Sequence, residues 1–348
     1  MGDGRAFFDG DENVIAKMNI TSSVAERVGI VLGEFGAGSF DEIFEGAINA
    51  PIDEFAGKDD AFPVVKGHSI NSRITSIPAI QRTVKKALVL RMKKKYNTGS
   101  LPETGMTFPV HFLLQKNRML FTLDTTGASL HKRGYRRLSG EAPIRETLAA
   151  GIVDIAHLRE GDTVCDPFCG SGTILIEAAM KLLNIAPGIN RSFIASEWKC
   201  FHRGIWEKEL EDARERIRRD KKIRLYGFDC DEEMTKLTMA NAKNAGVEEF
   251  ITAETRDIGD FIYPDSPCRI ITNPPYAQRM LDEDQVCAVY RTMGKRLLPL
   301  KENSLYAITS REDFPELFGA KEDKNRKLYN GMMKCRLYSY FGERPQKK

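Results

Sequence analysis

Between residues 163 and 309, apolar runs the length of one strand alternate with amphipathic segments the length of one helix. The runs are rich in β-branched and aromatic residues, which predicts strands separated by helices. The predicted strands are Thr163–Phe168, Arg224–Asp229, Phe250–Thr255, Arg269–Asn273 and Ser304–Thr309. Such alternation is typical of a parallel sheet with helices on both faces. We therefore expect a Rossmann-like, doubly wound α/β fold here.

The C-terminal end departs from this alternation. Apolar runs at Lys327–Tyr329 and Met333–Phe341 are separated by Asn330-Gly331, which is the strongest short signal for a β-hairpin. The sheet is therefore predicted to close with an antiparallel strand pair.

The part before residue 163 has shorter and more mixed elements, and its middle segment predicts a small α/β unit that carries a basic helix. In a long helix that begins near Ser76–Pro78, Val84, Leu88 and Met92 fall four residues apart and predict a buried stripe. The other predicted elements are strands at Val28–Leu32, Phe62–Ile70, Pro109–Leu114 and Met119–Asp124, and helices at Phe40–Ile48 and Ala142–Val153.

Composition places the chain among ordinary globular proteins. Of its 348 residues, 42% are hydrophobic and 29% are charged, and no apolar run approaches the ~20 residues of a membrane helix. The start of the chain has no apolar signal-peptide core. Seven cysteines without paired spacing indicate a reduced, cytoplasmic protein, and Cys165 and Cys169 lack the second pair that a zinc site would need.

The charge distribution is more informative than the overall charge of +3. Residues 1–60 carry 4 basic and 13 acidic side chains, residues 61–150 carry 16 and 4, and residues 151–348 carry 32 of each. A basic segment attracts phosphate backbones, although it can also be a solvated face. The candidate RNA contacts are Arg82, Lys85, Lys86, Lys93, Lys94, Lys95, Arg133 and Arg136.

A glycine-containing loop follows the first strand of the parallel sheet. Gly170 and Gly172 allow a tight turn and close approach to a ligand before a helix starts near Thr173. No Gly-Lys-Ser/Thr follows, which excludes a P-loop, and Leu175 replaces the third glycine of a dinucleotide loop. The opening acid, Asp166, suits a cationic ligand such as S-adenosylmethionine.

Acidic residues also end the next two strands. Asp229 can accept from both ribose hydroxyls of this cofactor, and Asp257 can accept from its adenine amino group. Each acid alone is more often a helix cap, but three at successive strand ends form a coherent site. The predicted cofactor contacts are Asp166, Cys169, Gly170, Ser171, Gly172, Thr173, Asp229 and Asp257.

The fourth strand ends in the tetrad Asn273, Pro274, Pro275 and Tyr276. The Asn273 side-chain oxygen and the Pro274 carbonyl can each accept one N–H of an exocyclic amine, which aims the lone pair at a sulfonium methyl group. The prolines fix the loop, and Tyr276 can stack on an extruded base. Direct in-line displacement of this kind needs no metal. Pro-Pro can also simply end a strand.

The tetrad alone indicates only that the acceptor is an amine. Adenine-N6 methylation of DNA or RNA and protein glutamine methylation use the same tetrad, but no DNA target-recognition domain is obvious and a glutamine substrate leaves the basic segment unexplained. A non-catalytic RNA-binding assembly factor is the alternative from a different class, which the intact acids and tetrad disfavour. A nicotinamide oxidoreductase is disfavoured by Leu175.

These motifs resemble those of class I S-adenosylmethionine-dependent amino-methyltransferases, and more narrowly the THUMP-containing 23S rRNA guanine-N2 methyltransferases of bacteria. The stretches that carry the resemblance are Asp166–Thr173, Asn273–Tyr276, Leu130–Arg136, Ala142–Ala149, Asn184–Phe193 and Lys327–Met332. The resemblance implies guanine-N2 methylation, with rRNA favoured over tRNA.

The resemblance also implies a domain order. We expect an α+β N-terminal region, with an incomplete ferredoxin-like segment at 1–58 and a THUMP RNA-binding domain at 59–130. A linker at 131–145 and the catalytic domain at 146–348 follow. Family members normally have a further strand and helix before the position of Gly4, which suggests a truncated chain, and Ala277-Gln278 replaces the usual Gly-Glu after Tyr276. Trp198 and Trp206, in the long stretch between Ala186 and Arg224, are expected to pack inside the protein rather than stack on RNA.

Overall fold

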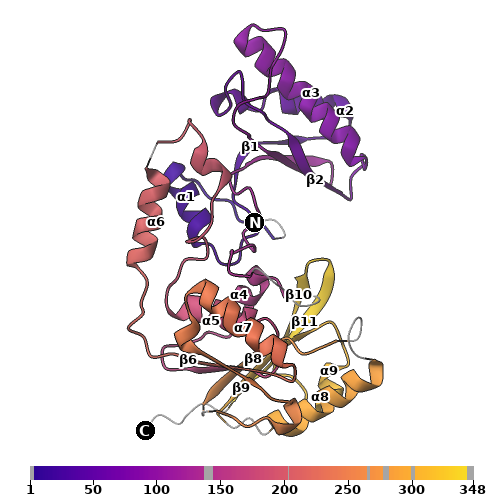
Figure 1. The fold of residues 1–348 in the computed structure, drawn as a ribbon. Coiled ribbons are helices and arrows are strands. Elements are labelled where there is room, and N and C mark those ends of the chain that lie inside the picture. The colour runs from indigo at the N-terminus through magenta and orange to yellow at the C-terminus, as the bar shows by residue number, and fades with distance from the viewer. Residues whose placement is uncertain are drawn as a thin grey trace. The chain divides into compact units, whose positions relative to one another are not determined.

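The computed structural model describes residues 4–136, 144–202, 204–264, 267–276, 282–298 and 302–342 (Figure 1). The chain divides into two units. One comprises Met1–Leu130 and Arg191–Asp212, and the other comprises His131–Asn190 and Ala213–Lys348. We call them the N-terminal unit and the catalytic-type unit. No helix within the described ranges is long and apolar enough to cross a membrane.

The N-terminal unit contains one four-stranded sheet in the order β1-β4-β3-β2. β1 pairs antiparallel with β4, β4 pairs antiparallel with β3, and β3 runs parallel to β2. The strands are β1 (Gly29–Gly36), β2 (Val64–Ile70), β3 (Val110–Gln115) and β4 (Arg118–Asp124). Residues 4–58 and 59–130 thus contribute to a single sheet through the β1–β4 pairing, and the division expected at residue 58 stays a prediction.

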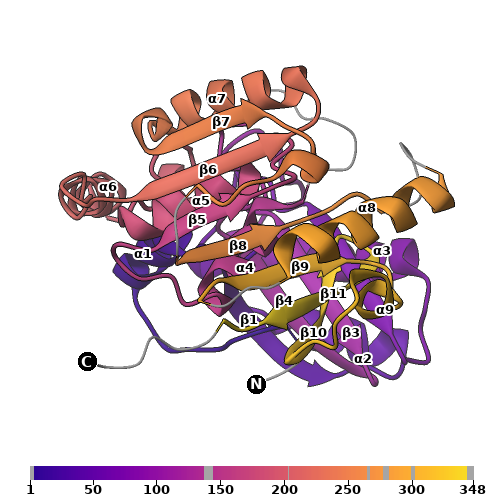
Figure 2. The same ribbon diagram turned by 90° about the horizontal axis from the view of Figure 1, so that it is seen from below.

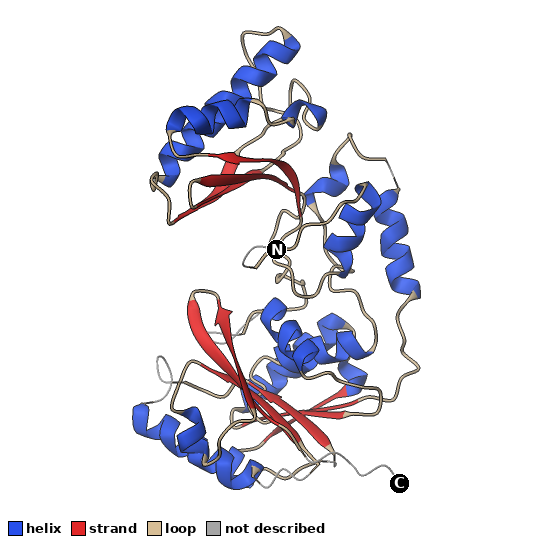
Figure 3. Cartoon of the chain, turned by 180° about the vertical axis from the view of Figure 1, so that it is seen from behind, coloured by secondary structure: helices blue, strands red, loops and turns tan. Residues whose placement is uncertain are grey.

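Two helices of the N-terminal unit, α2 (Phe40–Ile48) and α3 (Ile77–Tyr96), lie side by side on one face of this sheet (Figures 1 and 3). The stripe predicted on α3 is confirmed, because Val84, Leu88 and Met92 are all fully buried. The α+β arrangement expected before the parallel sheet is likewise confirmed, whereas its assignment as a THUMP domain stays a prediction. The unit also contains α1 (Glu12–Thr21), which the sequence patterns did not predict, and the short η1 (Ile52–Glu54).

The segment 191–212 belongs to the N-terminal unit although it lies far along the chain. Trp198 stacks on Phe108 with ring centroids 4.5 Å apart, and its indole N–H donates to the Thr107 carbonyl at 3.1 Å. Trp206 stacks on Phe193 at 5.2 Å. Both tryptophans are buried, which confirms the expectation that they pack inside the protein. Two helices fall in this region, η2 (Ile194–Glu197) and α6 (Ile205–Glu215).

The catalytic-type unit contains a seven-stranded sheet in the order β10-β11-β9-β8-β5-β6-β7. Neighbours from β9 to β7 run parallel, and β11 is antiparallel to both β9 and β10. The strands are β5 (Thr163–Asp166), β6 (Arg224–Asp229), β7 (Ile251–Thr255), β8 (Cys268–Thr272), β9 (Ser304–Thr309), β10 (Lys324–Asn330) and β11 (Met333–Tyr340). The doubly wound sheet and its closing hairpin were both predicted correctly.

Helices cover both faces of this sheet, with α4, α5 and α7 on one side and α8 and α9 on the other (Figures 1 and 2). Beneath α8 and α9, Tyr290, Met293 and Phe314 pack on Ile270 and Leu305 of the sheet. The helices are α4 (Glu146–Ile155), α5 (Thr173–Leu182), α7 (Glu232–Ala245), α8 (Glu283–Leu297) and α9 (Phe314–Phe318), with short η3 (Glu248–Phe250) and η4 (Ile258–Asp260).

Some predicted boundaries are wrong. The first parallel strand ends at Asp166 rather than Phe168, because Pro167 has no N–H and the Phe168 N–H turns back to the Asp166 side chain at 3.1 Å. The helix predicted at Ala142–Val153 starts at Glu146 and ends at Ile155.

Candidate functional site

The predicted site residues of the catalytic-type unit gather at the carboxyl ends of its parallel strands. Asp166 ends β5, Asp229 ends β6 and Asn273 directly follows β8. β5 and β8 are neighbours, and the helices that follow them cover opposite faces of the sheet. This is the topological switch point at which open α/β sheets bind ligands. Asp257 lies two residues beyond β7, where it caps η4 by accepting the Gly259 N–H at 2.7 Å.

The glycine loop between β5 and α5 is held by hydrogen bonds from its backbone N–H groups to β6. The Cys169 N–H donates to the Phe228 carbonyl at 2.8 Å, and the Gly170 N–H donates to the Asp229 carboxylate at 3.0 Å. Gly172 has φ +79°, and a Cβ there would lie 2.8 Å from a Thr238 methyl carbon, so only glycine fits. Ser171 and Thr173 share a hydrogen bond between their hydroxyls at 3.3 Å. The loop is therefore fixed in shape before any ligand arrives.

Two loop-supporting residues on α7 were missed by the sequence analysis. The Thr238 hydroxyl donates to the Gly170 carbonyl at 2.8 Å, and the Asn241 side chain donates to the Ser171 carbonyl at 2.9 Å. Thr235 and Asn244 continue this polar stripe at three-residue spacing, bonding to Thr255 and to the Tyr135 carbonyl. The sequence did contain a signal for these residues. Polar side chains recur at helical spacing on the face of α7 that would otherwise be apolar.

Asp166 is the most perturbed acid at this edge. It is 1% exposed, and burial raises its pKa to about 7. Hydrogen bonds from the Thr272 hydroxyl, at 2.6 Å, and from the Phe168 N–H oppose this rise, whereas the nearby Asp229 adds to it. Burial likewise raises the pKa of Asp229. Two desolvated carboxylates without a cation among their contacts in the described structure suit a ligand that brings positive charge and hydroxyl groups.

The Asn-Pro-Pro-Tyr loop lies at the same edge. Thr272 donates to Asp166 and immediately precedes Asn273, which ties the start of this loop to the end of β5. Pro274 is buried, and Asn273, Pro275 and Tyr276 are half-buried. Burial raises the pKa of Tyr276, and the nearby Asn330 side chain opposes this rise. Ala277 and Gln278, where the sequence departs from the resembled family, lie outside the described residues.

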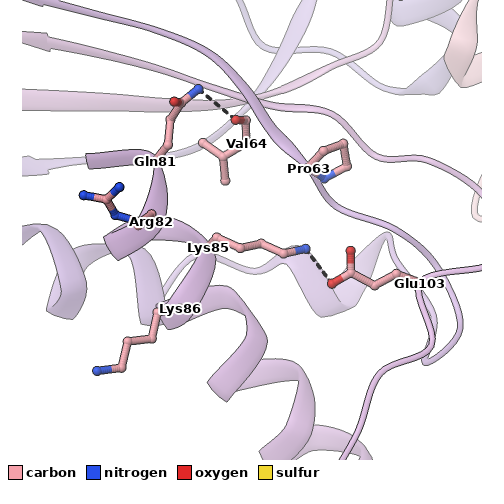
Figure 4. A pocket seen from close by; sticks show the side chains of 7 residues that line it. All are labelled: Pro63, Val64, Gln81, Arg82, Lys85, Lys86 and Glu103. Atoms are coloured by element: carbon pink, nitrogen blue, oxygen red, sulfur yellow. Dashed lines mark hydrogen bonds and ion pairs between the residues drawn. The ribbon is translucent and has the colours of Figure 1, made fainter. Parts of the chain in front are cut away.

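Three of the six predicted RNA contacts on α3 line an open hollow of about 520 Å³ in the N-terminal unit (Figure 4). Arg82 and Lys86 line it, as does Lys85, whose ammonium lies 2.6 Å from Glu103 and 3.9 Å from the centre of the Phe62 ring. Lys93, Lys94 and Lys95 end the helix, and Lys95 lies 3.7 Å from Asp53. No described acid pairs with Arg82, Lys86, Lys93 or Lys94.

Arg133 and Arg136 are corrections to the predicted RNA contacts. The Arg133 side chain is 1% exposed and forms an ion pair with Glu177 at 3.3 Å. The Arg136 side chain is 10% exposed and its Nε donates to Glu146 at 3.1 Å. Both arginines neutralise buried acids inside the catalytic-type unit, and a guanidinium shielded from solvent cannot reach a phosphate.

Comparisons with known proteins agree with this geometry. A family model for the RMKL-like methyltransferase domain matches residues 133–339. YpsC of Bacillus subtilis (strain 168), named as a candidate RNA methyltransferase, is 37% identical over 99% of this chain and 90% of its own length. The ribosomal RNA large subunit methyltransferase K/L of Psychromonas ingrahamii is 31% identical over 97% of this chain, which spans only 46% of that protein.

Two solved structures match nearly the whole chain. SMU.472, described as a candidate methyltransferase complexed with SAH, has a TM-score of 0.90 and 37% identity, and the match covers 97% of this chain and 89% of that one. A predicted N6-adenine-specific DNA methylase from Listeria monocytogenes str. 4b F2365 has a TM-score of 0.89 and 39% identity, with 96% and 87% covered.

The strand order, the acidic carboxyl edge and these likenesses define a methyltransferase of the α/β class. Within that class, the chain belongs to the RMKL-like methyltransferase-domain family. The family expected from the motifs is therefore confirmed.

Proposed function

We propose that this protein transfers a methyl group from S-adenosylmethionine to an exocyclic amine of a base in RNA, with guanine N2 in 23S rRNA as the foremost target. The observation that carries the proposal is the Thr272–Asp166 hydrogen bond of 2.6 Å, because it joins the glycine-loop strand to the strand that ends in Asn273. A cofactor acid and an amine-binding loop thereby share one edge of one sheet.

The cofactor proposal rests on the chemistry of the acids. Asp166 would face the cationic end of the bound cofactor, Asp229 would accept from the ribose hydroxyls and Asp257 would accept from the adenine amino group. The loop residues Cys169, Gly170, Ser171, Gly172 and Thr173 supply a close, fixed backbone surface. The SAH in the SMU.472 structure supports this assignment.

The tetrad positions the acceptor. When bound, the cofactor supplies an electrophilic methyl group on a sulfonium centre. The Asn273 side-chain oxygen and the Pro274 carbonyl accept the two amine N–H groups and leave the nitrogen lone pair pointing at that methyl group. Transfer would replace one amine N–H by N–CH3, with the electron pair of the broken methyl–sulfur bond kept by sulfur and the proton released to solvent. Pro275 restricts the loop and Tyr276 stacks on the base.

RNA is favoured as the substrate by the relatives' names and by the cations of α3. YpsC is named for RNA methylation, and the Psychromonas protein for ribosomal RNA. Helix α3 offers phosphates the positive charge of four side chains that pair with no described acid: Arg82, Lys86, Lys93 and Lys94. Lys85 and Lys95 instead form ion pairs with Glu103 and Asp53. The N-terminal unit is accordingly proposed to be a THUMP-type RNA-binding region.

Adenine N6 is the second candidate acceptor, because the Listeria relative is described as an N6-adenine-specific DNA methylase. A guanine-N2 enzyme acting on tRNA would use the same chemistry on another RNA. A non-catalytic RNA-binding factor would bind RNA without turnover.

The test is methyl transfer from labelled S-adenosylmethionine to unmodified 23S rRNA, unmodified bulk tRNA and adenine-rich DNA, followed by nucleoside analysis. Label in N2-methylguanosine from rRNA alone supports the proposal. Label in tRNA would show that tRNA is the substrate, and label in N6-methyladenosine would show that adenine N6 is the acceptor. Cofactor binding measured by calorimetry without label in any nucleic acid contradicts a nucleic-acid methyltransferase.

A further inference from the structure

The turn of the β10–β11 hairpin exposes apolar side chains to solvent. Asn330 pairs with Met333, which leaves Gly331 and Met332 as the two turn residues. Met332 is 100% exposed and Tyr329 is 54% exposed. Two-residue turns are normally built from Asn, Asp and Gly, so the turn itself does not explain a fully exposed methionine.

Polar contacts fix this hairpin tip beside the Asn-Pro-Pro-Tyr loop. The Asn330 side chain lies close enough to the Tyr276 hydroxyl to lower its pKa, and it accepts the Arg145 backbone N–H at 3.3 Å. Gly331 has φ +67°, and a Cβ there would lie 3.4 Å from the Arg145 guanidinium. The tip is thus held against the loop that we propose binds the acceptor amine, while Tyr329 and Met332 face solvent.

One face of the hairpin also concentrates positive charge. Lys327 and Tyr329 share this face, and their cross-strand partners are Arg336 and Lys334. Like charges placed directly opposite each other destabilise a strand pair, so the Lys327–Arg336 pairing has no structural benefit. Among the described residues, Glu312 alone forms the ion pairs with both Lys334, at 2.7 Å, and Arg336, at 3.5 Å. Lys327 lies 5.2 Å from the Tyr329 ring centre, and no described acid pairs with it.

We propose that the hairpin tip is a second RNA-binding element of this enzyme, in which Tyr329 and Met332 stack on an unpaired nucleotide next to the target base and Lys327 contacts its phosphate. This inference rests on the proposed function. An enzyme that works on a base must take it out of its stack, and exposed aromatic and methionine side chains replace the lost stacking. Basic side chains around an aromatic ring suit a single-stranded nucleic acid.

The test compares exposed apolar residues inside and outside the tip. In Met332→Ser and Tyr329→Ala, kcat/KM for methylation of the unmodified 23S rRNA transcript should fall on the order of tenfold, mainly through KM. Cofactor affinity and Tm should not change, because both side chains face solvent. The matched control is Ile262→Ser, since Ile262 is 69% exposed in the same unit and should retain full activity. Wild-type kcat/KM in both tip variants would overturn the proposal.

A crosslinking experiment separates this inference from the proposed function. The wild-type protein is irradiated with a 23S rRNA transcript that contains 4-thiouridine, and crosslinked peptides are identified by mass spectrometry. A crosslink within residues 327–336 supports the RNA contact even where no methyl transfer is detected. Crosslinks confined to other peptides, or none, overturn the contact even where methylation is robust.

Discussion

The edge of the catalytic-type sheet and the α3 face of the N-terminal unit both carry charge, but they do so in opposite ways. At the sheet edge, Asp166 is 1% exposed, and its partners Thr272 and Phe168 fix its orientation. On α3, Arg82, Lys86 and Lys94 are exposed on a regular helix whose other face is buried. Desolvated, oriented acids suit one small ligand, whereas mobile surface cations suit a polyanion of any sequence.

Asn273→Ala, at the sheet edge, should have the largest effect of the substitutions that test this difference. The variant should lose methyl transfer on the order of 10²- to 10³-fold, because a positioned acceptor of the amine N–H groups is gone. Cofactor affinity, measured by calorimetry, should stay within about twofold of wild type, since Asn273 is proposed to contact the acceptor rather than the cofactor. If cofactor affinity fell as far as turnover, the role assigned to Asn273 would be wrong.

Asp229→Ala should weaken cofactor binding by about 10- to 100-fold, since hydrogen bonds to charged groups contribute roughly 1.5–3 kcal/mol. The Gly170 N–H also loses its partner. The control is Asp231→Ala, which removes the cap of α7 and costs about 1 kcal/mol of stability but touches no predicted ligand group. Equal cofactor affinities in the two variants would contradict the role of Asp229.

We expect cofactor binding to depend on pH through the proposed contact with Asp166. Its pKa of about 7 means that the ionised form is lost below neutrality, so affinity should fall by about tenfold per pH unit below 7. In Asp166→Asn, affinity should be low and flat with pH. Calorimetric titrations between pH 5.5 and 8.5 measure both, and a wild-type affinity that is flat across this range would refute the assignment.

We also expect Asp166 to make the free energy of unfolding depend on pH. The sign is opposite to that of a carboxyl group whose pKa is lowered by an ion pair. Its pKa is raised from 3.8 to about 7 on folding, so the folded protein holds a proton that the unfolded chain releases between these values. The contribution of Asp166 to the free energy of unfolding is fully present below pH ~4. It falls by roughly 4 kcal/mol as the pH rises from there through 7. Asp166→Asn should therefore be more stable than wild type at pH 8 in urea denaturation. Equal stabilities at pH 8 would show that Asp166 is ionised without penalty.

The α3 face should respond more weakly, because each cation acts alone. Arg82→Ala and Lys86→Ala should each lower affinity for an RNA transcript by several-fold and reduce the salt dependence of binding by about one counterion. Lys85→Ala should change the salt dependence less, because Glu103 and the Phe62 ring already engage its ammonium. Filter binding across a range of salt concentrations would distinguish the three, and identical slopes would show that α3 is merely a solvated face.

The sequence was sufficient where local pattern and topology determine the result. The bounds predicted for β6, β9 and α2 match the structure, and Asp166 and Asn273 could be brought together because carboxyl ends of parallel strands share one edge. It was not sufficient where burial decides a residue's role. Arg133 reads as a surface cation until Glu177 is placed beside it, and Thr238 reads as an ordinary helix residue until the Gly170 carbonyl is found against it.

The insertion at 191–212 has a consequence for synthesis. Trp198 completes the packing around Phe108, yet it lies some 90 residues further along the chain and leaves the ribosome only after α4, β5 and α5. The N-terminal unit cannot complete its packing when its own first 130 residues emerge, because Phe108 still lacks Trp198. The first strand of the second sheet emerges before this partner does. The order of translation and the order of folding therefore run out of step in this chain, and its two tryptophans, both in the insertion, would report the late event by fluorescence.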